Sequence, residues 1–192
     1  FPAVIKLCDD EGLYLEPGSR YRIVANRAEL DAAFAALRAV KESPLVQEYI
    51  DGDGYGFSAV CDAGEAIAFF CHRRIREYPI DGGPSTLCVS MRDARLEEYG
   101  RRLLRRLRWS GPAMVEFKRE NRSGEYKLLE INPRFAGSLP LADHAGVNLP
   151  MALAGRFFAG RSPVRQPAYM VGRKTRFLLS DCASAASSLS HG

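Results

Sequence analysis

The alternation of apolar and polar residues predicts a chain in which short strands outnumber helices. Runs rich in β-branched and aromatic residues, bounded by glycine, proline or acidic residues, are typical of strands. Such runs lie at 2–7, 21–24, 44–50, 55–61, 65–72, 111–119 and 125–132. The polar segment 62–64 ends in glycine and separates two of these runs, so it predicts a hairpin.

A helical period of apolar residues predicts the remaining elements. Asn26 and Glu29 form a capping-box pattern. The residues that then fall on one helical face are Leu30, Phe34 and Leu37. Asp93 is expected to cap a second helix. Its inward-facing residues are expected to be Leu96, Tyr99, Leu103 and Leu107. Helices are also expected at 139–145 and 150–159, whereas the Ala/Ser-rich residues 180–192 are expected to be frayed.

Residues 111–132 predict a further hairpin, and its register decides where two carboxylates point. The turn cluster 120–124 ends in glycine, which is a hairpin signal. If residue 116 lies opposite residue 128, Glu116 and Glu130 are diagonal neighbours, roughly 7–8 Å apart at the backbone. One face then carries Met114, Glu116, Lys118, Tyr126, Leu128 and Glu130. A slip by one residue would send Glu116 to the other face.

The segment 127–138 carries the densest group of candidate site residues. Glu130 and Asn132 are two apart on the predicted strand, so they share a face, and Pro133 and Arg134 follow at the turn. Carboxylate and carboxamide oxygens suit Mg²⁺, and a guanidinium matches phosphate or carboxylate. Taken alone, these residues leave two interpretations open: a metal and anion site, or a strand-end ion pair followed by a proline turn.

Composition narrows the class of protein without identifying it. The chain of 192 residues, 46% hydrophobic and 26% charged, suffices for one large domain or two small lobes. Its formal charge of +4 permits an anionic ligand. The five cysteines are scattered without a Cys-x-x-Cys pair, which favours reduced thiols over a disulfide framework or a zinc site. No run is typical of a signal peptide or a membrane span, so no membrane partner is expected.

The arginine-rich helix after Asp93 raises a competing interpretation. Its arginines, at 101, 102, 105, 106 and 108, would suit a nucleic-acid backbone. Such a run is more often the solvated face of an amphipathic helix. We favour the solvated face and expect no nucleic-acid partner.

Together these patterns resemble the ATP-grasp superfamily, which has a metal-binding Glu on one strand and Glu-x-Asn-x-Arg on the next. Glu116 matches the first position, and Glu130, Asn132 and Arg134 match the motif. Four further segments match in the family's order: the phosphate-binding strand at 1–6, the adenine hinge at 46–52, a phosphate- or substrate-facing strand at 72–79, and its loop at 82–86. The branch that the chain resembles is that of carboxylate ligases related to carbamoyl-phosphate synthase and biotin carboxylase.

The resemblance implies an α+β fold of two lobes, 1–51 and 52–192, with the nucleotide site between them. It implies ATP and Mg²⁺ (or Mn²⁺) as cofactors. The metal would be held by Glu116, Glu130 and Asn132.

Roles for the other candidate residues follow from the same resemblance. Lys6 would hold phosphate oxygens and take part in catalysis, and Arg134 would stabilise the transferred group. The hinge residues Gln47, Glu48, Tyr49 and Ile50 would meet adenine, chiefly through their backbone. Arg74 and Arg76 alternate with Ile75 and are expected to share a face; phosphate, a substrate carboxylate and solvent all stay open as their partners.

The implied activity is that of a cytoplasmic carboxylate–amine ligase. ATP would phosphorylate a small-molecule carboxylate, and an amine or another nucleophile would attack the acyl phosphate. The rival interpretation is a nucleotide-binding regulatory module without chemistry.

Two features depart from the family pattern. A Gly-rich phosphate loop is common after the first strand, but residues 8–14 contain one glycine and three acids, which would repel a triphosphate. The family's upstream α/β domain and a second nucleotide-contacting lysine are not found. We therefore expect this chain to lack an N-terminal domain of the same protein and to show little ligase turnover alone.

Overall fold

The computed structural model describes residues 1–7, 21–40, 43–78, 83–160 and 168–190. The acidic stretch at 8–14, and residues 79 and 82 of the two matched segments, lie outside the described residues. The chain divides into two compact units, Phe1–Ile50 and Asp51–Gly192. Each unit has its own sheet and its own core, and each is described by itself below.

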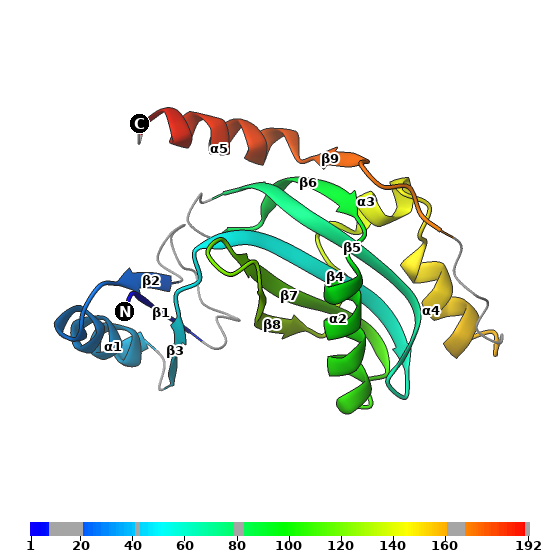
Figure 1. Ribbon diagram of the computed structural model, residues 1–192, viewed down its shortest axis with the longest axis horizontal. Helices are drawn as coiled ribbons and strands as arrows, with labels where there is room; N and C mark the ends of the chain where they lie inside the picture. Colours follow the sequence, from blue (N-terminus) through cyan, green and yellow to red (C-terminus); the bar gives the residue numbers. More distant parts are fainter. Residues whose placement is uncertain (8–20, 41–42, 79–82, 161–167, 191–192) are drawn as a thin grey trace. The chain divides into compact units, whose positions relative to one another are not determined.

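The first unit is a three-stranded antiparallel sheet with one helix packed on it (Figure 1). Its strand order is β2 (Tyr21–Val24), β1 (Ala3–Leu7), β3 (Pro44–Glu48), and its helix is α1 (Arg27–Val40). The core consists of Ile5, Leu7, Val24, Ala33 and Leu37. Because side chains alternate along a strand, Lys6 lies on the face of β1 opposite Ile5 and Leu7.

The N-cap bond predicted for α1 is present, but the Glu29 side chain accepts from the backbone N–H of the residue before the N-cap and not from that of Asn26 itself. The backbone N–H of Glu29 donates to Asn26 Oδ1 (3.0 Å), and Glu29 Oε2 accepts from the backbone N–H of Ala25 (2.8 Å). The first bond satisfies a backbone donor of the first helical turn, and the second satisfies the N–H of the residue before the N-cap. The start of α1 is therefore fixed by its local sequence.

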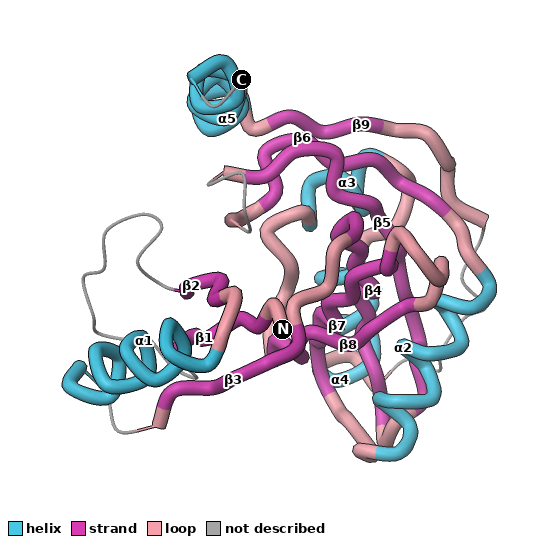
Figure 2. The backbone as a smooth tube through the Cα atoms, turned by 60° about the vertical axis from the view of Figure 1, so that its left-hand side comes forward, coloured by secondary structure: helices cyan, strands magenta, loops and turns pink. Residues whose placement is uncertain are grey.

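The second unit is built on a six-stranded antiparallel sheet, which Figure 2 traces as a continuous run of strands. Its strand order is β8 (Tyr126–Asn132), β7 (Gly111–Glu120), β4 (Gly52–Asp62), β5 (Glu65–Glu77), β6 (Ser85–Met91), β9 (Lys174–Arg176). Every residue of β4 from Gly54 to Cys61 is buried, so both faces of the sheet are covered there. Our strand predictions did not include β6.

Helix α2 (Ala94–Arg106) is capped by Asp93, as predicted: the Asp93 carboxylate accepts from the backbone N–H groups of residues 95 and 96. Its buried stripe is Leu96, Gly100 and Leu104. Gly100 allows close approach to the sheet, since a Cβ there would lie 2.3 Å from a ring carbon of Phe57. The prediction that Leu107 points inward is wrong: Leu107 follows the helix as its C-cap and is 50% exposed.

The arginines of α2 make contacts within their own unit. Arg105 Nε donates to Glu65 (2.7 Å), and the Arg95 guanidinium donates to Glu125 (3.1 Å). Arg101 lies over the ring of Phe69, 4.1 Å from its centroid. These contacts give the basic run a structural role on its own sheet.

The other helices of the second unit are α3 (Leu139–His144), α4 (Leu149–Phe157) and α5 (Leu178–Ser190). The expectation of a frayed end at 180–192 is wrong for the described part of that segment. Residues 178–190 form a helix whose Asp181 and Ser184 are buried. A segment of Ala and Ser lacks an apolar stripe, and here polar contacts to the sheet supply the order. Among the described residues, no helix is long and apolar enough to span a membrane.

Candidate functional site

The hairpin of β7 and β8 brings the two predicted carboxylates directly opposite each other. Glu116 pairs with Glu130 and Met114 pairs with Asn132, so the diagonal register that we expected is wrong. The register shifts between Glu116 and its neighbour Phe117, which pairs with Leu128. This irregularity keeps the carboxylates on one face. It moves Tyr126 and Leu128 off the face that they were expected to share with Lys118, whose partner is residue 127.

The side chain of Asn132 joins the two carboxylates. Its Nδ2 donates to Glu116 Oε1 (3.1 Å) and to Glu130 Oε1 (2.9 Å). The Asn132 amide thus bridges the two carboxylates by hydrogen bonds at the end of β8. The convergence of Glu116, Glu130 and Asn132 is what the sequence motif predicted, although the register that produces it differs.

Arg74 of β5 reaches across β4 to this group. Its Nη2 donates to Glu116 Oε2, and its Nη1 lies 3.6 Å from Glu77 Oε1. Gly54 makes this crossing possible, because a Cβ at that position would lie 2.8 Å from both Arg74 Cδ and Glu77 Oε1. The Arg74 guanidinium therefore lies between two carboxylates of the same unit.

Burial shapes the electrostatics of this group. The side chains of Arg74 and Glu116 are 16% and 12% exposed. Desolvation raises the pKa of Glu116; the Arg74 charge opposes this shift, and the nearby Glu130 carboxylate adds to it. Desolvation likewise raises the pKa of Glu77, again opposed by Arg74. A cation beside Glu116 and Glu130 would lower the free energy of their ionised forms.

The donor set fits a hard divalent cation. Two carboxylates supply oxygen ligands of the kind that Mg²⁺ and Mn²⁺ take, and the carboxamide of Asn132 would add a third if its Oδ1 took the place of the Nδ2 that now faces them. Within the described part of the chain, no cluster of three or more His, Cys, Asp or Glu side chains could hold a metal ion. The candidate group therefore consists of two carboxylates and the carboxamide of Asn132.

Arg134 follows the carboxylate pair at the end of β8. Its side chain is exposed, and its Nη1 donates to the backbone carbonyl of Phe135 (3.1 Å). The guanidinium is thus accessible at the same strand end as Glu130 and Asn132.

Arg76 is bound by a residue that the sequence analysis did not single out. Its Nε and Nη2 donate to the two carboxylate oxygens of Asp181 in α5 (2.7 and 2.6 Å). The expectation that Arg74 and Arg76 share one regular face is wrong, because the ladder shifts between them and pairs them with the consecutive residues Cys88 and Leu87. Arg74 and Arg76 accordingly contact different partners.

The predicted residues of the first unit lie on its small sheet or directly after β3. Lys6 and Gln47 share one face, since Gln47 lies opposite Val4 and side chains two apart on β1 point the same way. Glu48 is exposed at the end of β3, and Ile50 is buried. The backbone N–H of Tyr49 donates to the carbonyl of Pro2 (3.4 Å).

His72 is a buried polar residue to which the sequence analysis gave no role of its own. Ser138 Oγ lies 3.4 Å from each of its ring nitrogens, and its ring is stacked near Phe70. Burial, helped by the Arg74 charge, lowers the pKa of His72 to about 3, so the ring is neutral at pH 7. Gly56 makes room for it, since a Cβ there would lie 2.2 Å from His72 Cε1. No local pattern marks such a residue, because its partner is distant in the sequence.

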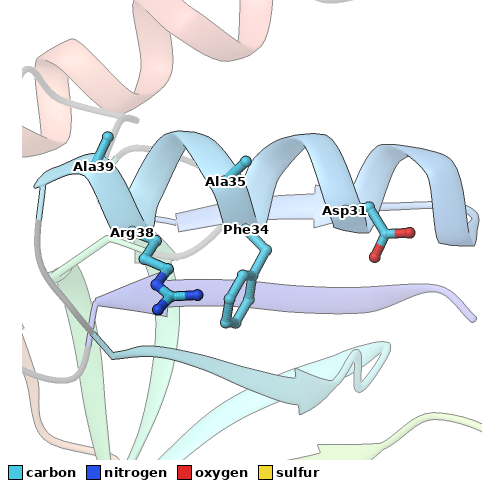
Figure 3. A pocket seen from close by; sticks show the side chains of 5 residues that line it. All are labelled: Asp31, Phe34, Ala35, Arg38 and Ala39. Carbon is cyan, nitrogen blue, oxygen red and sulfur yellow. The ribbon is translucent and has the colours of Figure 1, made fainter.

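A surface depression lies along α1 in the first unit (Figure 3). It is lined by Asp31, Phe34, Ala35, Arg38 and Ala39. None of these residues belongs to a matched family segment, and the depression lacks a converging pair of carboxylates. It is therefore not a candidate for the metal site.

Comparison with known proteins defines the class. Residues 41–175 match the family profile described as ATP-grasp in the biosynthetic pathway with Ter operon. The match covers more than half of the chain, so the chain belongs to the ATP-grasp family. The resemblance inferred from the sequence is confirmed.

Individual relatives agree with this assignment. The chain is 30% identical over 165 residues to acetyl-CoA carboxylase 2 of Arabidopsis thaliana, covering 79% of this chain and 7% of the relative. It is 26% identical over 159 residues to the carbamoyl phosphate synthase large chain of Methanosarcina acetivorans, covering 78% of this chain and 15% of the relative. The chain thus spans a small part of the curated relatives that it matches.

A solved structure confirms the fold. The biotin carboxylase domain of the Hydrogenobacter thermophilus 2-oxoglutarate carboxylase, solved with MgADP, ADP and bicarbonate, superposes with a TM-score of 0.64 at 16% identity. The superposition covers 91% of this chain and 40% of that chain. The predicted α+β ATP-grasp fold is therefore confirmed.

Proposed function

We propose that this chain is the nucleotide-binding part of an ATP-dependent ligase that acts on a small-molecule carboxylate. The observation that carries the proposal is the convergence of Glu116, Glu130 and Asn132 on one face of the β7–β8 hairpin. Family membership supports it, because the matched profile and the relatives are ATP-grasp proteins and carboxylases or synthases.

Glu116, Glu130 and Asn132 would hold Mg²⁺ or Mn²⁺. Such an ion would neutralise charge on the phosphates of ATP. Arg74 compensates the charge of the buried Glu116 carboxylate. We propose that it also contacts a phosphate or a substrate carboxylate. We assign this contact to Arg74 before Arg76, because Arg76 is bound to Asp181.

Arg134 is proposed to stabilise the phosphoryl group during transfer and the oxyanion that forms when the acyl phosphate is attacked. Its exposed guanidinium at the end of β8 suits a role in the transition state. Neither step requires a protein nucleophile, since the acyl phosphate is attacked by an amine or another external nucleophile.

The first unit is proposed to supply nucleotide contacts. Lys6 would hold phosphate oxygens. Peptide groups of Gln47, Glu48 and Tyr49 would meet the edge of adenine, and Ile50 would pack on the ring. In this proposal, residues 1–51 form the small ATP-grasp lobe and residues 52–192 form the large lobe with the metal site.

The reaction proposed is phosphorylation of a carboxylate by ATP, followed by attack of an amine or another nucleophile on the acyl phosphate. The partners proposed are small-molecule carboxylates and amines, together with a further domain of the same protein. Cys61, Cys71 and Cys88 are buried free thiols, which fits a reducing compartment, and we propose the cytoplasm.

A second candidate function is nucleotide binding without chemistry. The observation that favours it is the acidic sequence Asp9-Asp10-Glu11, where the family often has a Gly-rich phosphate loop. Phosphate release with Mg-ATP and a panel of carboxylates, with and without amines, separates the two functions. Release that depends on one carboxylate supports a ligase, whereas tight binding of Mg-ATP without carboxylate-dependent release supports the regulatory module.

A further inference from the structure

Helix α5 holds the end of β5 from more than one hundred residues away in the sequence. Asp181 accepts both hydrogen bonds of the Arg76 fork (2.7 and 2.6 Å). It also accepts from Thr86 Oγ1 (3.1 Å) and lies 3.1 Å from Arg176 Nε. Asp181 is 4% exposed, and the Arg76 hydrogen bonds hold the pKa of its carboxyl below its usual value. A buried carboxylate with three cationic or hydroxyl partners is a firm anchor.

A second contact lies one helical turn further along α5. Ser184 Oγ donates to the backbone carbonyl of Glu77 (2.9 Å), and Ser184 is 1% exposed. The helix therefore binds two successive residues of β5, one through its side chain and one through its backbone.

The end of β5 needs such an anchor, because its strand pairing is irregular there. The pairing of β5 with β4 runs only as far as Arg73, which lies opposite Tyr55. Beyond that point the ladder to β6 shifts twice, between Arg74 and Arg76 and again before Glu77. A strand with one irregular neighbour is held more weakly than a strand paired on both sides.

The anchored segment flanks the residue that enters the carboxylate group. Arg74 contacts Glu116, and Glu77 lies 3.6 Å from Arg74. We propose that Asp181 and Ser184 are positioning residues: they fix the irregular end of β5 and so aim Arg74 at Glu116 and the ligand beside it. This inference rests on the proposed function for the choice of ligand. It assigns a role to α5, which begins after residue 175, where the match to the family profile ends.

The variants that test the proposal are Asp181→Asn and Ser184→Ala, with Asp62→Asn as the control. Asp62 accepts from Arg156 Nε (2.6 Å) and so ties α4 to the β4–β5 hairpin, far along the strand from Arg74. Asp62→Asn removes one helix-to-sheet carboxylate without touching the end of β5. Comparison with this control separates positioning of the site from general stabilisation.

Two measurements are made at a temperature where every variant is folded. Calorimetric titration with Mg-ATP is expected to show affinity reduced about 2- to 30-fold in Asp181→Asn, less in Ser184→Ala, and unchanged in Asp62→Asn. Hydrogen exchange is expected to be faster at residues 74–77 in Asp181→Asn and unchanged there in Asp62→Asn.

The outcomes are distinguishable. Equal Mg-ATP affinity in Asp181→Asn and the unsubstituted chain would overturn the positioning role, as would unchanged exchange at 74–77. If the unsubstituted chain bound no Mg-ATP, the proposed function would fall, and the exchange data alone would decide whether α5 orders the end of β5. If Asp181→Asn does not fold, Ser184→Ala is used in its place. Unchanged Mg-ATP affinity and unchanged hydrogen exchange at residues 74–77 in Ser184→Ala would then overturn the proposal.

Discussion

Glu116 and Glu130 lie directly opposite each other on β7 and β8, and the amide of Asn132 donates to both carboxylates. Two carboxylates this close repel each other unless positive charge compensates them. Arg74 supplies one such charge at Glu116. The arrangement suits a divalent cation on the accessible side. Such a cation would remove the repulsion between the two carboxylates, which one arginine only reduces.

Glu130→Gln tests the metal assignment. The substitution keeps the size of the side chain and removes one charge from the site. We expect the fold to persist and the affinity for ATP in the presence of Mg²⁺ to fall at least about tenfold. Calorimetric titration with Mg-ATP measures the loss. Glu125→Gln, at an exposed position outside the carboxylate group, is the control and is expected to leave the affinity unchanged.

Arg134→Ala tests the role in the transition state. Arg134 is exposed, and its Nη1 donates to the backbone carbonyl of Phe135, so its loss is expected to leave the fold intact. We expect ATP affinity to change by less than about twofold, and kcat to fall on the order of a hundredfold where turnover is measurable in the natural protein. Weaker ATP binding with turnover unchanged at saturation would show that Arg134 acts in ground-state binding instead.

Glu77 gives a prediction about pH. Burial raises its folded-state pKa above the ordinary 4.5, despite Arg74. Its contribution to stability is therefore fully present below the unfolded pKa and is lost as pH rises through the folded pKa. Glu77→Gln cannot lose this contribution. As pH rises from about 4.5, the free energy of unfolding of the variant is therefore expected to increase relative to that of the unsubstituted chain. Urea titrations across pH 4 to 8 measure the difference; a constant difference would contradict the shifted pKa.

The core register of α2 gives a prediction about stability. Leu104 is fully buried and Leu107 is 50% exposed. Leu104→Ala is expected to lower the free energy of unfolding by about 2–5 kcal/mol. Leu107→Ala, the matched control, is expected to lower it by less than about 1 kcal/mol. Urea unfolding measures both losses. A larger loss for Leu107→Ala than for Leu104→Ala would support the inward-facing position of Leu107 that the sequence predicted.

The local sequence was sufficient to predict an element or its cap wherever the determining pattern lay within that one element. The strand Tyr21–Val24 and the caps at Asn26 and Asp93 lie where alternation and capping chemistry placed them. The convergence of Glu116 with Glu130 was predictable from residue spacing, because residues on facing strands share a face in one register. The directly opposed register was not, since the shift beside Phe117 is a cross-strand irregularity with no marker in the sequence.

Contacts between distant segments account for what the sequence left undetermined. The pairing of Arg76 with Asp181 joins residues 105 positions apart, and the sequence near either residue contains no pattern that predicts it. The same holds for Ser184 and Glu77, so an Ala/Ser-rich segment was mistaken for a frayed end. Gly54 is a related case. Only the structure shows that this position must be glycine, because the Arg74 side chain crosses it and leaves no space for a Cβ.

The central claim is that Glu116, Glu130 and Asn132 bind a divalent cation shared with ATP. Thermal unfolding of the chain with ATP, with Mg²⁺, with both and with neither tests this claim most directly. Because shared ligation couples the two binding events, the rise in Tm with both ligands is predicted to exceed the sum of the separate rises. The excess is predicted to disappear in Glu130→Gln. An equal rise in Tm with ATP in the presence and absence of Mg²⁺ would contradict the account.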